Sequence, residues 1–199
     1  MSTVGTAQRT DAELMAEVQA GSDAAFRVLF ARHRPTIEGF LYRLLWDRAL
    51  AEDLAQEVFL RLWLARDRYE PLRPLPVFLY CIAKNLWLHE RARRNHRPPP
   101  VSLEGPLDLD ALEAAHRALA DEPTLPEQLL FAHERMFRIR QALMKLPSGQ
   151  RLVFTLSHFE GLRYAEIAEV LEIPLGTVKS RMNAAVLKLR RHLSSLLEE

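Results

Sequence analysis

Residues 164–191 read YAEIAEVLEIPLGTVKSRMNAAVLKLRR, a pattern that predicts two short amphipathic helices meeting at a proline. In the first helix, apolar side chains recur at the spacings of three and four that mark a buried helix face. They are Tyr164, Ile167, Ala168 and Leu171. Pro174 suits the first position of the second helix, where the N–H that proline lacks would have no partner. The buried face of that helix is predicted to hold Leu175, Val178, Met182, Val186, Leu189 and Leu193. Together the two helices form the pattern of a helix-turn-helix.

The other face of the second helix carries hydrogen-bonding and cationic side chains, as a helix in the major groove of DNA requires. The candidate contacts to duplex DNA are Pro174, Gly176, Thr177, Lys179, Ser180, Arg181 and Asn183. Between residues 175 and 191 there are five Lys or Arg and no Asp or Glu, so the net charge is +5. An ordinary bundle helix with a solvated basic face is the alternative. The short turn and the small residues that begin the second helix favour DNA binding.

Composition narrows the class of protein. The chain has 199 residues, of which 48% are hydrophobic, enough for one or two domains with cores. No apolar run approaches the roughly 18 residues that span a bilayer, and the N-terminus lacks a secretory pattern, so we expect a cytoplasmic protein with no membrane insertion. The single cysteine, Cys81, has no thiol partner, and we expect no metal and no cofactor. With no catalytic cluster or Gly-rich phosphate loop, the chain is not expected to be an enzyme.

The net charge of +1 hides an uneven distribution. Residues 84–97 contain five cations and one acid, a balance of +4, whereas residues 101–127 contain one cation and seven acids, a balance of −6. The acidic part also contains prolines and reads as a linker. Helical periodicity lies on both sides of it and no alternating strand pattern is present. We therefore predict an all-α protein with two small helical domains, residues 10–97 and 127–197, joined by a flexible acidic linker over 98–126.

Helix signals subdivide the first domain. Thr10 and Glu13 have the spacing of a capping box, Gly21 is predicted to end the first helix, and Ser22 to cap the next. Within that second helix Pro35 predicts a kink or a break. A third helix is expected over residues 51–66, followed by a stiff proline-rich loop over 67–76 and a fourth helix over 77–94.

The third helix has a narrow polar strip in which acids stand beside leucines. Its members include Asp53, Gln56, Glu57, Leu60 and Arg61. Such a strip is either the thin solvated edge of a central bundle helix or a docking face for a partner. The pattern alone leaves both open.

Aromatic and cationic side chains alternate along the fourth helix. The stripe consists of Tyr80, Lys84, Trp87, Arg91 and Arg94. Single-stranded nucleic acid binds to such surfaces, because bases stack on rings while cations neutralise phosphates. The alternative places Tyr80 and Trp87 in the core and treats the arginines as a solvated helix end favoured by the helix dipole. From the sequence the two interpretations are evenly matched.

Three segments in this order resemble the extracytoplasmic-function sigma factors of the bacterial sigma-70 family. AEDLAQEVFLRLW is similar to their polymerase-docking segment, FLYCIAKNL to their −10 promoter segment, and LPSGQRLVFTLSHFEGLRYAEIAEVL with GTVKSR to their −35-binding domain. The resemblance spans most of the chain. It implies a sigma factor that binds core RNA polymerase and directs promoter recognition and transcription initiation.

The resemblance also implies roles for particular residues. Asp53, Gln56, Glu57 and Leu60 would face the polymerase clamp, with Arg61 beside them. Lys84 and Asn85 would lie near the melted −10 strand, and the helix-turn-helix would bind the duplex −35 element. The acidic linker would thread towards the active-site and RNA-exit channels, and its charge would discourage the free protein from binding DNA. The free protein is expected to be a monomer and to have an anti-sigma factor as a partner.

The sequence departs from the family pattern at several positions. Phe78 stands where the family usually has Trp, and His89 where it usually has Asp. Glu172 occupies a position in the turn that is commonly Gly, and if φ is positive there a side chain costs about 1 kcal/mol. Ala184 and Val186 replace residues that are often basic, so we expect weak −35 binding by the isolated protein.

Two other function classes remain open from the sequence. A stand-alone helix-turn-helix repressor or activator would normally dimerise to match a two-fold operator. An RNA-binding adaptor would use the stripe that contains Tyr80 and Trp87, and would bind structured RNA tightly.

Overall fold

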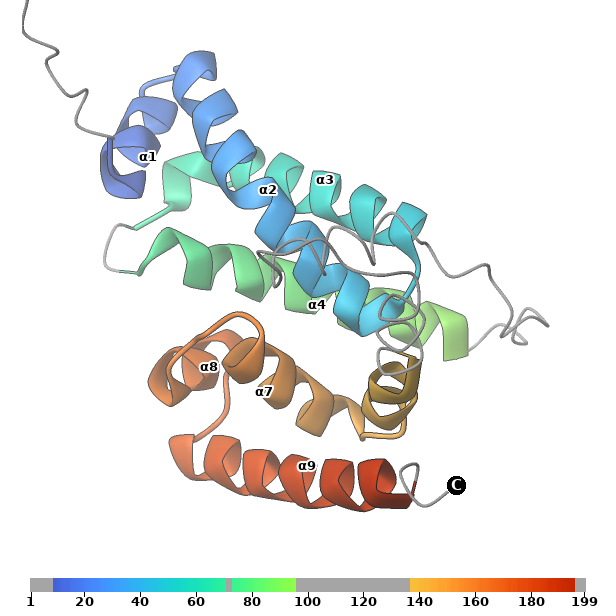
Figure 1. The fold of residues 1–199 in the computed structure, drawn as a ribbon. Helices are drawn as coiled ribbons and strands as arrows, with labels where there is room; N and C mark the ends of the chain where they lie inside the picture. Colours follow the sequence, from blue (N-terminus) through green and yellow to red (C-terminus); the bar gives the residue numbers. More distant parts are fainter. Residues whose placement is uncertain (1–8, 71–72, 96–136, 196–199) are drawn as a thin grey trace, which may run out of the picture.

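The protein is described by a computed structural model that covers residues 9–70, 73–95 and 137–195. These residues form helices joined by turns, and no strand occurs among them (Figure 1). The first domain contains α1 (Asp11–Gln19), α2 (Asp23–Leu45), α3 (Arg48–Leu64), the short 3-10 helix η1 (Arg66–Arg68) and α4 (Leu75–Asn95). The second contains α7 (Ser148–His158), α8 (Tyr164–Leu171) and α9 (Leu175–Ser195), preceded by a helical segment over residues 137–144. The all-α prediction is confirmed. The acidic linker over 98–126 lies outside the described residues.

The first helix begins and ends at the predicted signals, and the second begins at its predicted cap. The Thr10 side chain accepts a hydrogen bond from the Glu13 backbone N–H, and the Glu13 carboxylate accepts one from the Thr10 N–H, which completes the capping box. Gly21 follows α1 with φ of 92°, a conformation in which glycine meets no steric cost. Ser22 then caps α2 through the Ala25 N–H.

Pro35 lies inside α2 and does not end it. The helix is continuous from residue 23 to residue 45. Proline removes one backbone donor, and the apolar residues on both sides of it, including Leu29 and Phe40, are fully buried. The packing of α2 against α1, α3 and α4 holds the helix together across this site.

The other predicted bounds in this domain shift by a few residues. Asp47 caps α3 by accepting from the Leu50 N–H, so the helix starts three residues earlier than the sequence suggested. The predicted loop over 67–76 begins with η1, and α4 already starts at Leu75. Pro76 is therefore in the first turn of α4, where proline is tolerated.

The second domain has the predicted helix-turn-helix, formed by α8 and α9. Glu172 follows α8 with φ of 55° and ψ of 44°, in the left-handed region that the turn position suggested. The Pro174 carbonyl accepts from the Val178 N–H, so Pro174 caps α9 and the helix proper begins one residue later.

The buried face of α9 is rotated relative to the predicted stripe. Val178, Ala185 and Leu189 are buried, whereas Leu175 and Val186 are 42% and 38% exposed. Residues seven apart return nearly to the same side of a helix, so the face that begins at Val178 continues at Ala185. The prediction that Leu175 and Val186 belong to the core is wrong.

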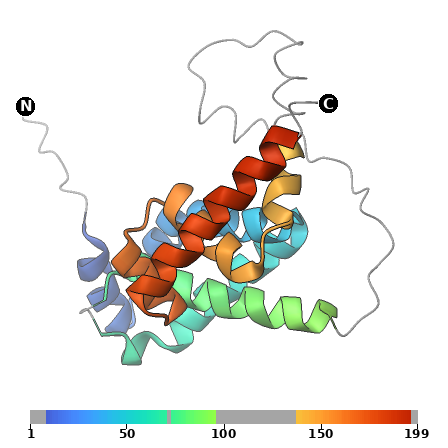
Figure 2. The same cartoon turned by 90° about the horizontal axis from the view of Figure 1, so that it is seen from below.

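The two domains pack against each other. Helix α8 lies against α4, and α7 lies against α2, an arrangement that Figures 1 and 2 show from two directions. One continuous apolar cluster includes buried residues of both domains. A smaller cluster in the second domain, built on Ala142, Leu143 and Leu146, receives the ring of Trp46 from the end of α2.

Candidate nucleic-acid interface

The predicted docking residues lie on one open strip of α3. Asp53, Gln56, Leu60 and Arg61 are exposed and Glu57 is partly exposed. Leu60 is 51% exposed, and Leu64, one turn further on, is 69% exposed. Glu57 Oε1 accepts from Arg61 Nε at 2.8 Å, a pair that fixes one carboxylate beside the leucines. The strip thus offers apolar side chains and acids to a partner.

The predicted duplex-reading residues lie at the start of α9, and most are free. Pro174, Gly176, Lys179, Ser180 and Asn183 are exposed, while Thr177 is partly exposed. The Ser180 hydroxyl donates to the Thr177 carbonyl at 3.1 Å, which leaves its lone pairs available.

Arg181 differs from the other residues of this group because it packs towards its own domain. A Cβ placed on Gly149, at the start of α7, would lie only 3.0 Å from Arg181 Nη1. The absence of a side chain at Gly149 therefore makes room for this guanidinium. Arg181 is partly buried, and so is less available to DNA than Lys179.

The aromatic and cationic stripe on α4 is divided by burial. Tyr80, Lys84 and Trp87 are buried, whereas Arg91 and Arg94 are exposed. Asn85, which lies beside the stripe, is also exposed. The Tyr80 ring packs edge-on against Phe40, with centroids 5.1 Å apart, and the Arg91 guanidinium lies 5.8 Å from the centroid of Trp87. Neither ring is open to a base in this arrangement.

Arg94 is also engaged within the first domain. Its guanidinium donates to Glu90 at 2.9 Å and to Asp47 at 3.1 Å. The Glu90 carboxylate accepts from Arg93 as well, and these hydrogen bonds hold the pKa of Glu90 below its usual value. The sequence reading of Arg94 as a phosphate contact requires it to leave or share these partners.

Two carboxylates of the second domain contact the stripe. Glu160, after α7, accepts from Arg43 Nη2 at 2.6 Å and from the Tyr80 hydroxyl at 2.8 Å, and its side chain is 1% exposed. Glu172, in the turn of the helix-turn-helix, accepts from Lys84 Nζ at 3.0 Å. These contacts could not be predicted, because periodicity identifies the apolar face of a helix but not the polar groups that will meet across it.

These contacts shift the pKa values of the groups involved. Burial, and then the negative charge of Glu160, raise the pKa of Tyr80 far above the physiological range, so its hydroxyl remains a donor. The hydrogen bond and charge of Lys84 lower the pKa of Glu172. Burial raises the pKa of Cys81, whose thiol faces the Val170 carbonyl oxygen at 3.9 Å. Cys81 is therefore an unreactive thiol at the junction of α4 and α8.

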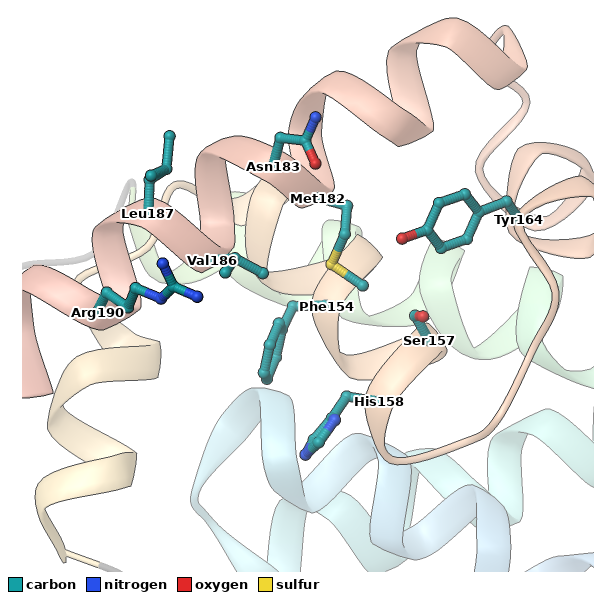
Figure 3. A pocket seen from close by; sticks show the side chains of 9 residues that line it. All are labelled: Phe154, Ser157, His158, Tyr164, Met182, Asn183, Val186, Leu187 and Arg190. Atoms are coloured by element: carbon teal, nitrogen blue, oxygen red, sulfur yellow. The ribbon is translucent and has the colours of Figure 1, made fainter.

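A groove on the second domain is a further feature that the sequence reading missed. It has a volume of about 610 Å³ and lies between α7, α8 and α9 (Figure 3). Its lining consists of Phe154, Ser157, His158, Tyr164, Met182, Asn183, Val186, Leu187 and Arg190. Val186 and Leu187 are both exposed. Two adjacent apolar residues on a basic helix cannot both face the core, and this pattern could have indicated an exposed apolar surface from the sequence.

The sequence matches two families, one for each domain. Residues 29–97 match Sigma-70 region 2, and residues 136–189 match Sigma-70, region 4. The RNA polymerase sigma-H factor of Pseudomonas aeruginosa is 33% identical over 192 residues, which cover 96% of this chain and 98% of the relative. The ECF RNA polymerase sigma factor SigW of Bacillus subtilis is also 33% identical, over 90% of this chain and 95% of its own length. The chain belongs to the extracytoplasmic-function sigma factors.

Solved structures agree with the sigma factor fold. CnrH, solved in complex with the cytosolic domain of CnrY, superposes with a TM-score of 0.66 at 24% identity, over 93% of this chain and 97% of that one. RpoE of Bartonella quintana, solved with the anti-sigma factor NepR, gives a TM-score of 0.61 at 22% identity, over 85% and 96% of the two chains. The fold is thus shared with these two solved structures.

Within residues 9–70, 73–95 and 137–195, none of the helices combines the length and the hydropathy of a membrane span. The same part of the chain holds no group of three or more His, Cys, Asp or Glu side chains placed to bind a metal ion.

Proposed function

We propose that this sigma factor binds core RNA polymerase through the strip on α3 and contacts promoter DNA with α4 and α9. The observation that carries the proposal is the strip itself, where Leu60 and Leu64 are exposed between charged side chains. A soluble helix gains nothing by exposing two leucines one turn apart, whereas a partner that covers them gains apolar contact area. The acids around them would select a basic partner surface.

The DNA contacts follow from the exposed ends of two helices. Lys179 and Asn183 on α9 can reach base edges or phosphates of duplex DNA. On α4, Asn85 and Arg91 are exposed, and Tyr80, Lys84 and Trp87 would join them only after the second domain moves. In this proposal the chain has no catalytic activity of its own, and the polymerase makes the RNA in the cytoplasm.

We also propose domain bounds of 10–97 and 127–197, with a linker over 98–126, and a monomeric free state. An anti-sigma factor is proposed as a further partner, in keeping with the family and with the complex of RpoE with the anti-sigma factor NepR.

Run-off transcription tests the function. Core polymerase from a bacterium, mixed with this protein and fragments of the source genome, should yield discrete transcripts that are absent with core polymerase alone. Transcripts that start at the same sites without the protein would refute the assignment. A stable homodimer that binds duplex DNA without polymerase would favour a repressor instead.

A further inference from the structure

The stripe on α4 is covered by acids of the second domain. The Glu160 side chain, 1% exposed, accepts from Tyr80 of α4 and from Arg43 of α2. The Glu172 carboxylate binds Lys84, whose own side chain is only 7% exposed. The two carboxylates therefore accept from three donors of the first domain, each of which lies at least 80 residues earlier in the chain.

Weaker contacts surround these hydrogen bonds on both sides. Cys81 faces the Val170 carbonyl oxygen beneath α8. At the other edge, Arg151 Nη1 reaches the Leu44 carbonyl at 3.4 Å, and Arg140 lies 5.3 Å from the centre of the Trp46 ring. The domains thus meet over a continuous surface and not at one accidental pair.

The interface is not attractive throughout. Arg91 of α4 and Arg151 of α7 are close enough for the charge of Arg91 to lower the pKa of Arg151, after burial, which is the larger cause. Two like charges facing each other oppose closure. The two carboxylates therefore carry the charge attraction that keeps α4 covered.

The Glu172 carboxylate accepts from Lys84 and the Glu160 carboxylate accepts from Tyr80, so each occupies a position that a phosphate oxygen could take. Lys84 and Tyr80 are buried while Glu172 and Glu160 hold them, so a nucleic-acid strand cannot reach the same face of α4. Competition between carboxylate and phosphate for the same donors follows.

We propose that Glu160 and Glu172 form an intramolecular latch that closes the second domain over the nucleic-acid face of α4 in the free protein. This inference rests on the proposed function of α4 as the surface for the melted strand. The latch opens when the domains separate, and opening exposes Lys84 and Tyr80 together with Cys81. With the latch closed, the free protein binds single-stranded DNA poorly. A partner that separates the domains, as the proposed binding of polymerase would, removes the block.

Cys81 provides a built-in reporter, because it is the single cysteine of the chain and is buried where α4 meets α8. We would measure the rate at which a thiol reagent labels it in the full-length free protein, relative to the rate for the same variant in urea. Glu160→Gln is expected to accelerate labelling about tenfold, since it removes a charge-assisted hydrogen bond that is shielded from water. Glu172→Gln is expected to accelerate it about two- to fivefold, because that carboxylate is largely exposed.

Glu169→Gln is the matched control. Glu169 is an exposed acid on α8, and within the part of the chain that the structure describes its side chain forms no ion pair. Removing its charge should leave the labelling rate unchanged. Circular dichroism must show native helix content in each variant, and Glu172→Gln, altered at an exposed side chain, keeps the test valid if Glu160→Gln fails to fold.

Unchanged labelling in Glu172→Gln and in folded Glu160→Gln would overturn the latch. The same variants should also bind a fluorescent oligo-deoxythymidine probe more tightly than the natural protein does, by factors similar to those for labelling. Faster labelling without tighter binding would overturn the masking of a nucleic-acid surface. Either failure would leave the sigma factor function standing, because run-off transcription judges that function separately.

Discussion

In the part of the chain that the structure describes, two residues other than glycine have left-handed backbone conformations, Trp46 and Glu172, and their strain is offset differently. Trp46 ends α2 with φ of 54°, and its ring packs against Tyr42 and against the smaller cluster of the second domain. Glu172 has φ of 55°, but its side chain is largely exposed and makes one ion pair. Strain at Trp46 is therefore offset by packing, whereas little offsets it at Glu172.

Glycine at position 172 should stabilise the second domain. Glu172→Gly removes the side chain from a residue whose backbone is left-handed, and should raise the free energy of unfolding by up to about 1 kcal/mol. Thermal unfolding in high salt, where the pair with Lys84 is screened, is the measurement. Glu172→Ala keeps the strain and serves as the control. Equal stability of the Gly and Ala variants would show that no strain is stored at this turn.

The sequence located one of these sites and not the other. A turn between two helices, compared with a family that commonly has glycine there, identified position 172. Position 46 carries no Gly or Asn, and its conformation depends on a tertiary contact of the ring, which local patterns do not encode.

At the scale of the helices, spacing predicted which elements exist better than where they end. The capping signals at Thr10 and Ser22 were correct because a cap is a local hydrogen bond. The start of α3 at Asp47 was missed because that cap follows a turn with no distinct pattern. On α9 the apolar spacing allowed either Ala185 or Val186 on the core side, and packing selected the smaller residue.

Helix α3 is expected to be the polymerase-binding element. Glu57→Lys should weaken association with core polymerase about ten- to hundredfold, because it places a cation where the strip presents an acid. Glu38→Lys is the control: Glu38 also pairs with an arginine four residues away but lies on α2, outside the strip. Competition binding with labelled natural protein measures both. Equal affinities for the two variants would remove this strip from the interface.

Helix α9 is expected to read the duplex element. Lys179→Ala should lower the salt dependence of promoter binding by the holoenzyme by about one phosphate contact, a slope change of roughly 0.9. Asn183→Ala should reduce discrimination between promoter variants in the −35 element, by about 1 to 3 kcal/mol if its amide contacts a base. Lys188→Ala, further along the helix, should weaken binding equally for all sequences. Normal −35 discrimination in a Lys179→Ala, Asn183→Ala double variant would contradict this orientation of α9.

At the scale of the whole molecule, the division into two helical domains could be predicted, and their contact could not. The charge reversal around residue 100 and the separate helical patterns reveal two units. The pairing of Glu160 with Tyr80 joins residues 80 positions apart, and neither residue is unusual in its own helix. For the same reason, the sequence could not decide whether Tyr80 and Trp87 are buried or exposed. Both rings are buried in a structure in which the second domain packs on α4.

Strand opening by the holoenzyme depends on Lys84 in two opposing ways if both proposals hold. Lys84 holds Glu172 in the free protein and is the proposed contact for the melted strand in the open complex. Lys84→Ala should therefore accelerate labelling of Cys81 in the free protein about two- to fivefold, because it removes the same partly exposed ion pair as Glu172→Gln. In the holoenzyme the same variant should impair promoter opening. Glu172→Gln should speed labelling by a similar factor and open the promoter as well as the natural protein does.

Permanganate footprinting of unpaired thymines gives the opening measurement, on a promoter identified by run-off transcription. Each holoenzyme is tested on linear duplex and on a template whose −10 region is already mismatched. A base pair costs energy to open, so a lost contact to the melted strand should reduce reactivity on the duplex more than on the mismatched template. Equal loss by Lys84→Ala on both templates would indicate a damaged fold. Normal promoter opening by Lys84→Ala would show that Lys84 stabilises only the closed form of the free protein. The melted strand would then be bound by the exposed residues of α4, of which Asn85 and Arg91 would be tested first.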